Sequence, residues 1–147
     1  MGESGKAEVT VIDAKGLILG RMASIVAKRL LAGEKIVIVN AEKALISGKK
    51  ASIIEESMKF LEVGHYRKGP IHPRRPDTIV KKVIRGMLPR KKPRGIQALK
   101  RLRVFIGVPR EFENVERETI SEADAGKLKC PYITVSQLSQ SIGWKGE

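Results

Sequence analysis

The chain has 147 residues, of which 41% are hydrophobic, so it can bury the core of one domain and is not a disordered tail. Its longest aliphatic run, Ile36–Val39, is too short to cross a membrane, and its single cysteine, Cys130, excludes a framework of internal disulfides. The net charge of +13 is concentrated in residues 65–110, which carry 15 Lys and Arg against one acid while the rest carries 14 against 15, and this predicts a polyanionic partner.

The first forty residues have the pattern of a strand, a helix and a second strand. Residues 9–13, VTVID, are rich in β-branched side chains, which predicts a strand. Apolar residues then recur at helical spacing from Met22 to Leu30, which predicts a helix over residues 21–32. Residues 36–40, IVIVN, are apolar on both faces, as in an interior parallel strand. Together they predict a βαβ unit with a right-handed crossover.

The next segment changes from helical periodicity to an irregular basic stretch. Apolar residues between Ala51 and Leu61 lie on one side of a helix predicted over residues 47–63. Residues 64–76, GHYRKGPIHPRRP, combine glycine, proline and basic residues without any periodicity. We therefore expect an extended basic loop there.

A third helix is predicted over residues 78–87, with Asp77 as its N-cap. At roughly 100° per residue its apolar positions fall within an arc of about 140°. These positions are Ile79, Val80, Val83, Ile84 and Met87. Lys81, Lys82 and Arg85 fall on the opposite side. One face should therefore pack on the core while the other is cationic.

Proline marks the boundary to a fourth helix. Pro89 ends the preceding helix, and Pro93 suits the first turn of a helix over residues 93–102. The apolar contacts expected for this helix are Ile96, Leu99 and Leu102. Residues 104–108, VFIGV, predict a final strand.

The chain shows no internal repeat and no sign of a second domain. We predict one domain over residues 1–147, with a core over about 9–112 and a C-terminal extension over about 113–147. The extension is acidic at first, and residues 136–142 favour a short helix.

Enzymatic motifs are weak. Gly16 and Gly20 lie between a strand and a helix, but a Walker loop needs four residues between its glycines and a following Lys-Ser/Thr, and here Arg21 follows a three-residue gap. His65 and His72 lack the further ligands of a zinc site. We expect no enzyme, no cofactor and no metal. A phosphate-handling enzyme is the alternative that the βαβ start and the two glycines leave open.

The basic segment favours nucleic acid. Twelve lysines and arginines lie between Arg74 and Arg103 with almost no acid among them. Aromatic residues are only 4%, which argues against a stacking platform for single strands, so contacts to the phosphates and shape of structured RNA are expected. DNA stays open on composition alone, because helices over 78–87 and 93–102 would imitate a helix-turn-helix.

Three stretches of the sequence carry a family resemblance. VIDAKGLILGRMAS, IVIVNAEK and RGMLPRKKPRGIQALKRLRVFIG resemble the large-subunit ribosomal protein family thirteen, over about Val9 to Phe112. The most specific block is Gly86-Met87-Leu88-Pro89, a basic spacer, Gly95 and then Leu99-Lys100-Arg101-Leu102. The short connection at residues 32–35 resembles the archaeal or eukaryotic type.

The resemblance implies a three-layer α/β/α fold with a four-stranded, mainly parallel sheet. It also implies a structural constituent of the cytoplasmic large ribosomal subunit that binds and stabilises folded ribosomal RNA through phosphate contacts, early in assembly, beside neighbouring ribosomal proteins. No catalysis, membrane or small-molecule substrate is implied. The implied RNA contacts are Arg21, Lys28, Arg67, Lys68, His72, Arg74, Arg75, Lys81, Lys82, Arg85, Arg90, Lys91, Lys92, Arg94, Lys100, Arg101 and Arg103.

Overall fold

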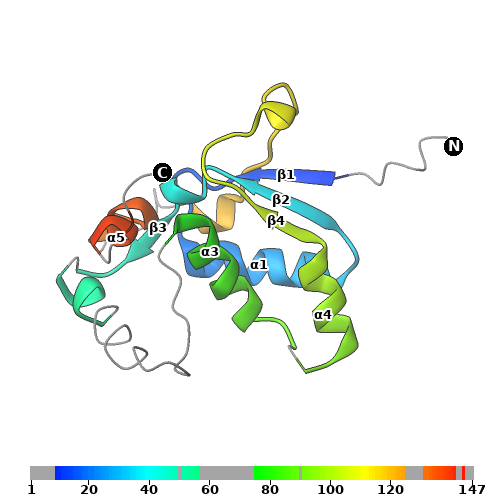
Figure 1. Cartoon of the computed structure of the whole chain (residues 1–147), viewed down its shortest axis with the longest axis horizontal. Coiled ribbons are helices and arrows are strands. Elements are labelled where there is room, and N and C mark those ends of the chain that lie inside the picture. The colour runs from blue at the N-terminus through cyan, green and yellow to red at the C-terminus, as the bar shows by residue number, and fades with distance from the viewer. Residues whose placement is uncertain are drawn as a thin grey trace, which may run out of the picture.

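The computed structural model in Figure 1 combines helices with a mostly parallel sheet. It describes residues 9–49, 51–56, 75–89, 91–124, 131–141 and 144. The strands are β1 (Val9–Asp13), β2 (Lys35–Val39), β3 (Leu45–Ser47), β4 (Leu102–Val104) and β5 (Tyr132–Thr134). The α-helices are α1 (Leu19–Leu31), α3 (Pro76–Gly86), α4 (Pro93–Lys100) and α5 (Val135–Ser141). Short 3-10 helices lie at Ala41–Lys43, Arg110–Phe112 and Ser121–Ala123.

The main sheet has three parallel strands in the order β1-β2-β4. Val9 pairs with Lys35, and Ile36 pairs with Leu102. The predicted strand–helix–strand start is confirmed, with α1 beginning two residues earlier than expected. A four-stranded sheet is not confirmed within the described residues, because β3 pairs instead with β5 in a separate antiparallel ribbon.

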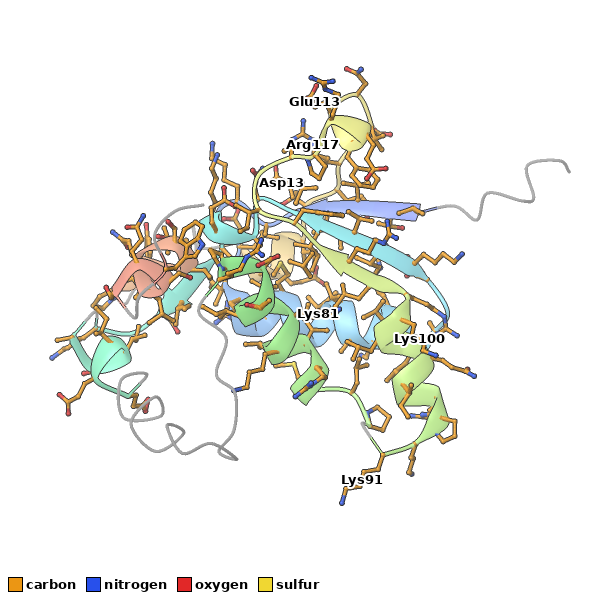
Figure 2. All side chains as sticks on the ribbon, in the orientation of Figure 1. Asp13, Lys81, Lys91, Lys100, Glu113 and Arg117 are labelled. Atoms are coloured by element: carbon orange, nitrogen blue, oxygen red, sulfur yellow. The ribbon has the colours of Figure 1, made fainter. Side chains whose placement is uncertain are left out.

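The two faces of the sheet are covered differently. Figure 1 shows α1, α3 and α4 on the same side of it, so three layers of helix, sheet and helix are not confirmed in the described part of the chain. The other face buries Val11, Val37 and Val39 beneath the segment that follows β4. Phe105 and Phe112 lie over them with ring centroids 5.9 Å apart. Figure 2 labels Glu113 and Arg117 on the segment that follows β4.

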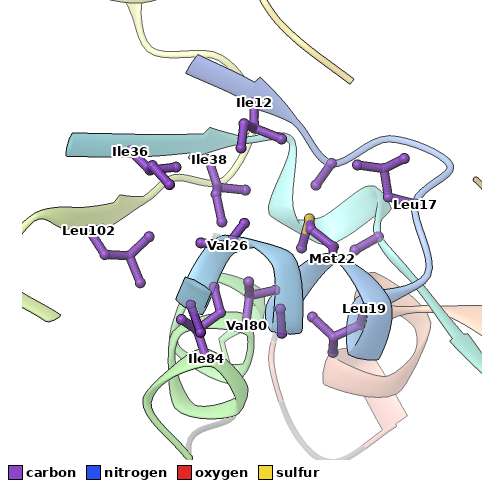
Figure 3. Close-up of a cluster of buried hydrophobic side chains, with 14 of the residues drawn as sticks. Ile12, Leu17, Leu19, Met22, Val26, Ile36, Ile38, Val80, Ile84 and Leu102 are labelled. Atoms are coloured by element: carbon purple, nitrogen blue, oxygen red, sulfur yellow. The ribbon is translucent and has the colours of Figure 1, made fainter. Parts of the chain in front are cut away.

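Alternation along the strands sends the larger side chains toward the helices. Ile36 and Ile38 of β2 are fully buried against α1, whereas Val37 and Val39 belong to the opposite face. Figure 3 shows this core, in which Val80 and Ile84 of α3 reach the same cluster across α1. The side chains labelled in Figure 3 are Ile12, Leu17, Leu19, Met22, Val26, Ile36, Ile38, Val80, Ile84 and Leu102. Burial of this apolar area is the main favourable term in folding.

The predicted strand over residues 104–108 was wrong beyond its first residue. β4 ends at Val104, and Gly107 has φ +68°, a left-handed conformation that ends the extended run. The Phe105 N–H still donates to the Ile38 carbonyl at 2.8 Å. Phe105 and Val108, which lie within the predicted strand, instead cover the second face of the sheet.

The predicted helix over residues 47–63 was wrong at its start. Ser47 ends β3, and Gly48 has φ +128°. Residues 51–56 are helical, while 57–63 lie outside the described residues. A three-residue strand is missed because its partner β5 lies far away in the sequence.

The α3 helix begins earlier than predicted, so Pro76 belongs to it and not to the preceding loop. Arg75 is the N-cap, in extended conformation, and Pro76 suits the first helical position because it needs no N–H partner. Asp77 is therefore in the first turn and was wrongly predicted to cap. Its Oδ1 accepts from the Thr78 N–H at 2.9 Å.

Two apolar residues assigned to the core are exposed. Met87 follows the end of α3 and is 43% exposed, and Ile96 of α4 is 47% exposed. Gly95 and Ala98 are the buried positions of α4, whereas the buried Leu102 belongs to β4. A Cβ on Gly95 would overlap the Pro89 carbonyl oxygen, so the helix packs through its smallest residues and turns Ile96 outward.

The C-terminal segment returns to the domain. The α5 helix runs over Val135–Ser141, close to the predicted 136–142, of which 142 lies outside the described residues. The Val135 N–H donates to the Ala44 carbonyl at 2.9 Å. Ile133 and Leu138 form a small cluster with side chains that include Ile46.

Candidate nucleic-acid interface

The α3 helix presents its cations on the side opposite its core contacts, as predicted. Val80 and Ile84 are fully buried, and Lys81, Lys82 and Arg85 are exposed. In Figure 2, Lys81 lies on the side of α3 toward β4, where it lines a groove with Arg103. The buried residues hold the helix down on α1, and this contact sets the direction in which the cations point.

A second group of cations comes from α4 and its approach. Lys91 and Lys92 precede the helix, Arg94 is in its first turn and Lys100 ends it, and all four are exposed. Figure 2 shows Lys91 and Lys100 near opposite ends of this group. Proline at the first position fixes where the helix begins, so the basic spacer lies directly before it.

Arg103 reaches the same region from β4. It pairs in register with Val37, and its side chain is exposed. A groove of about 480 Å³ is lined by Lys81, Arg103, Phe105 and Glu111, among others. Cations of a helix and of a strand thus meet at one hollow, although they are 22 positions apart.

These eight exposed side chains form what we call the cationic surface: Lys81, Lys82, Arg85, Lys91, Lys92, Arg94, Lys100 and Arg103. Within the described ranges, none of them has a carboxylate within 4.0 Å. Asp77, the one acid of the basic segment, is already engaged at 3.4 Å by Arg75. The cationic surface is therefore not neutralised by the described part of its own domain.

Arg101 differs from its basic neighbours. Its Nη1 donates to the Leu30 carbonyl oxygen at 2.9 Å, and the side chain is partly buried. Leu30 lies in the last turn of α1, and its carbonyl oxygen also accepts from the Gly33 N–H at 3.0 Å. Arg101 thus fastens β4 to the end of α1, a structural role that charge counting does not reveal.

The two predicted contacts on α1 are both exposed. Arg21 and Lys28 are seven residues apart, about two turns and about 10 Å along one face of the helix. Arg21 also lines a hollow together with Ile79 and Val83, which places it beside α3. The predicted contacts that lie outside the described residues are Arg67, Lys68, His72, Arg74 and Arg90.

The charged side chains around strand β1, at one edge of the main sheet, are paired with one another. Arg29 donates to both carboxylate oxygens of Glu34 at 2.8 Å and contacts Glu118 at 3.4 Å. This hydrogen-bonded pairing lowers the pKa of Glu34 and raises the pKa of Arg29. Asp13 accepts from the Asn40 amide at 3.0 Å and lies 3.9 Å from Arg117. We call Asp13, Arg29, Glu34, Arg117 and Glu118 the paired cluster.

One feature that sequence reasoning missed is a small apolar hollow inside the cationic surface. It is lined by Arg85, Leu88, Gly95, Ile96 and Leu99 and has a volume of about 210 Å³. The available signal was Gly95, because a glycine in a helical first turn often marks a close backbone approach. The expectation that Ile96 would be buried concealed it.

No metal or membrane element accompanies this surface. Among the residues described, no group of three His, Cys, Asp or Glu side chains is placed to hold a metal ion. In the same part of the chain no helix has both the length and the apolar character needed to span a bilayer.

Comparison with known proteins gives consistent matches. The sequence model of the family described as Ribosomal protein L13 matches residues 7–111. The Large ribosomal subunit protein uL13 of Methanopyrus kandleri is 50% identical, over 94% of this chain and 89% of that protein. The proteins of that name from Methanosarcina barkeri and Saccharolobus solfataricus are 52% and 45% identical, over 93% and 95% of this chain and 99% and 95% of their own. These matches continue well into the C-terminal segment.

Proposed function

The chain belongs to the ribosomal protein L13 family, whose members are structural and not enzymatic, and from this premise we propose that it binds and stabilises folded large-subunit ribosomal RNA. The observation that carries the proposal is the cationic surface, eight exposed lysines and arginines without a carboxylate partner in the described residues. Its setting is the cytoplasmic large subunit, next to other ribosomal proteins.

The mechanism follows from the charge of RNA. Folding brings phosphates close together, and lysines and arginines that contact them release condensed counterions and reduce their repulsion. Arginine forks such as Arg85 also match phosphate geometry with two hydrogen bonds. A protein acting in this way favours the folded RNA, which supports a role early in subunit assembly.

We rank the proposed contacts among the described residues by their exposure and by whether they already have a partner. The cationic surface is the proposed main contact, and Arg21 and Lys28 are a second one along α1. Arg101 is assigned to holding α1, and Arg75 is shared with Asp77. The further contacts we carry from the family resemblance are Arg67, Lys68, His72, Arg74 and Arg90.

A salt titration of RNA binding tests the proposal. If about seven phosphates are neutralised, the logarithm of the binding constant should fall with the logarithm of salt concentration at a slope of about −5 to −6. Filter binding to transcribed archaeal large-subunit RNA measures this slope. A slope near zero would refute the proposal, and equal affinity for duplex DNA in competition would favour the DNA-binding alternative.

A further inference from the structure

The apolar hollow between the end of α3 and the start of α4 has an unusual position. Four of its five lining residues, all but Arg85, lack a polar side chain, yet it opens within the cationic surface. Ile96 at its edge is 47% exposed, whereas Leu88 is only 6% exposed. The exposed Ile96 side chain beside these cations suits a ligand that is partly apolar and partly negatively charged.

The hollow is held by close backbone packing. Gly95 lies so near Pro89 that a Cβ would overlap the Pro89 carbonyl oxygen. The Lys92 N–H donates to that same carbonyl at 3.0 Å, and the Gly95 N–H donates to the Lys92 carbonyl at 3.0 Å. These contacts fix the turn against α4, so the hollow is formed before any ligand arrives. Preformed sites bind with a smaller entropic cost.

The surrounding charge selects the ligand. Arg85 lines the hollow, Lys91 and Lys92 lie directly before α4, and Arg94 lies in its first turn. Asp77 is eight positions before Arg85, about 12 Å along the helix axis. An apolar protein side chain gains nothing from this concentration of positive charge, whereas a nucleotide brings a phosphate with each base.

We propose that the hollow receives one unpaired base of the bound RNA, with the base against Leu88, Ile96 and Leu99 and the adjoining phosphate on Arg85. This inference rests on the proposed RNA binding. The volume of about 210 Å³ is below the roughly 300–1,000 Å³ of pockets for drug-sized ligands, so one base fits better than a whole nucleotide. Unstacked bases are the usual target of specific RNA recognition, and a guanidinium plane also stacks on them.

The test combines binding with chemical probing of transcribed archaeal large-subunit RNA in complex with the full chain. Ile96→Ala should weaken binding about tenfold, because it removes three carbons from a contact that the base completes. One base protected by the wild-type protein should become reactive, while the backbone footprint and the salt slope stay unchanged. Met87→Ala is the matched control, because Met87 is 43% exposed nearby but does not line the hollow.

Each outcome separates this inference from the proposed function. A wild-type backbone footprint without any protected base overturns the inference and leaves RNA binding intact, whereas the absence of both overturns both. If Ile96→Ala binds RNA normally but enters subunits poorly, a protein neighbour occupies the hollow and the inference is wrong. Ile96→Gln, which keeps helix propensity, must show the same loss, and thermal unfolding verifies that both variants fold.

Discussion

Arginine has opposite roles in two regions of this molecule. In the paired cluster, Arg29 is held by Glu34 and Glu118 and ties the end of α1 to the segment beyond β4. In the cationic surface, Arg85 and Arg94 have no carboxylate partner among the described residues. The same residue type is structural where acids surround it and available to a ligand where they do not. The position of the acids therefore distinguishes these two regions.

The largest expected effect comes from the glycine that shapes the cationic surface. Gly95→Ala places a methyl group on the Pro89 carbonyl oxygen and should cost about 3 kcal/mol of stability, because backbone cannot yield as a side chain can. Chemical denaturation measures the loss. Gly20→Ala in α1 is the control, since no atom beyond its chain neighbours and its own helix backbone lies within 4 Å of the new methyl group. Equal stability of the two variants would show that the packing at Gly95 is wrong.

The second effect separates binding from stability. Replacing Lys81, Lys82 and Arg85 together by alanine removes three of the proposed phosphate contacts and should weaken RNA binding about 100-fold at 0.1 M salt. The melting temperature should hardly change, because these side chains point away from the core. The matched control replaces the exposed Lys15, Lys35 and Lys43 by alanine, outside the cationic surface. Equal losses of affinity in both triple variants would mean that only net charge matters.

A smaller effect distinguishes two arginines that are two positions apart. Arg101→Met should lower stability by about 1.5 kcal/mol, because the Leu30 carbonyl loses its charged donor. RNA affinity should change little. Arg103→Met should instead weaken RNA binding and leave stability almost unchanged, since Arg103 is exposed and has no ion-pair partner among the described residues. Thermal unfolding and filter binding of both variants test these roles. If Arg101→Met weakened RNA binding and Arg103→Met lowered stability, the two roles would be wrong.

The smallest effect concerns pH in the paired cluster. Because the folded pKa of Glu34 is lowered, its contribution is present above the unfolded value of about 4.3 and is lost as pH falls through the folded value. Glu34→Gln should therefore be less stable than the wild type at pH 7, by less than about 1 kcal/mol for a partly exposed pair. Melting curves should converge once the pH has fallen below the folded pKa of Glu34. A difference that persists there would exclude the charge as its cause.

Local patterns were enough to predict much of the fold. The strand at 9–13, the helix that follows it and the outward cations of α3 were predicted because periodicity and β-branched residues act over short distances. The β3 strand was missed because its only strand partner among the described residues, β5, lies more than eighty residues later. Pairing of that kind leaves almost no local trace.

The sequence predicted where the positive charge of the candidate site lies, but not the role of each basic residue. The density of lysine and arginine indicated the cationic surface, but no local pattern separates Arg101, bound to a carbonyl, from the exposed Arg103. Helical spacing likewise predicted Ile96 in the core. Spacing alone does not show that the backbone of Pro89 packs against the helix at Gly95. Long-range packing decides both cases.

The position of the cationic surface in the assembled large subunit tests the central claim most directly. An experimental structure of that particle should show Lys81, Lys82 and Arg85 within hydrogen-bonding distance of RNA phosphates, with the Arg29–Glu34 contact unchanged. If the same three side chains face open solvent in that structure, the account is contradicted.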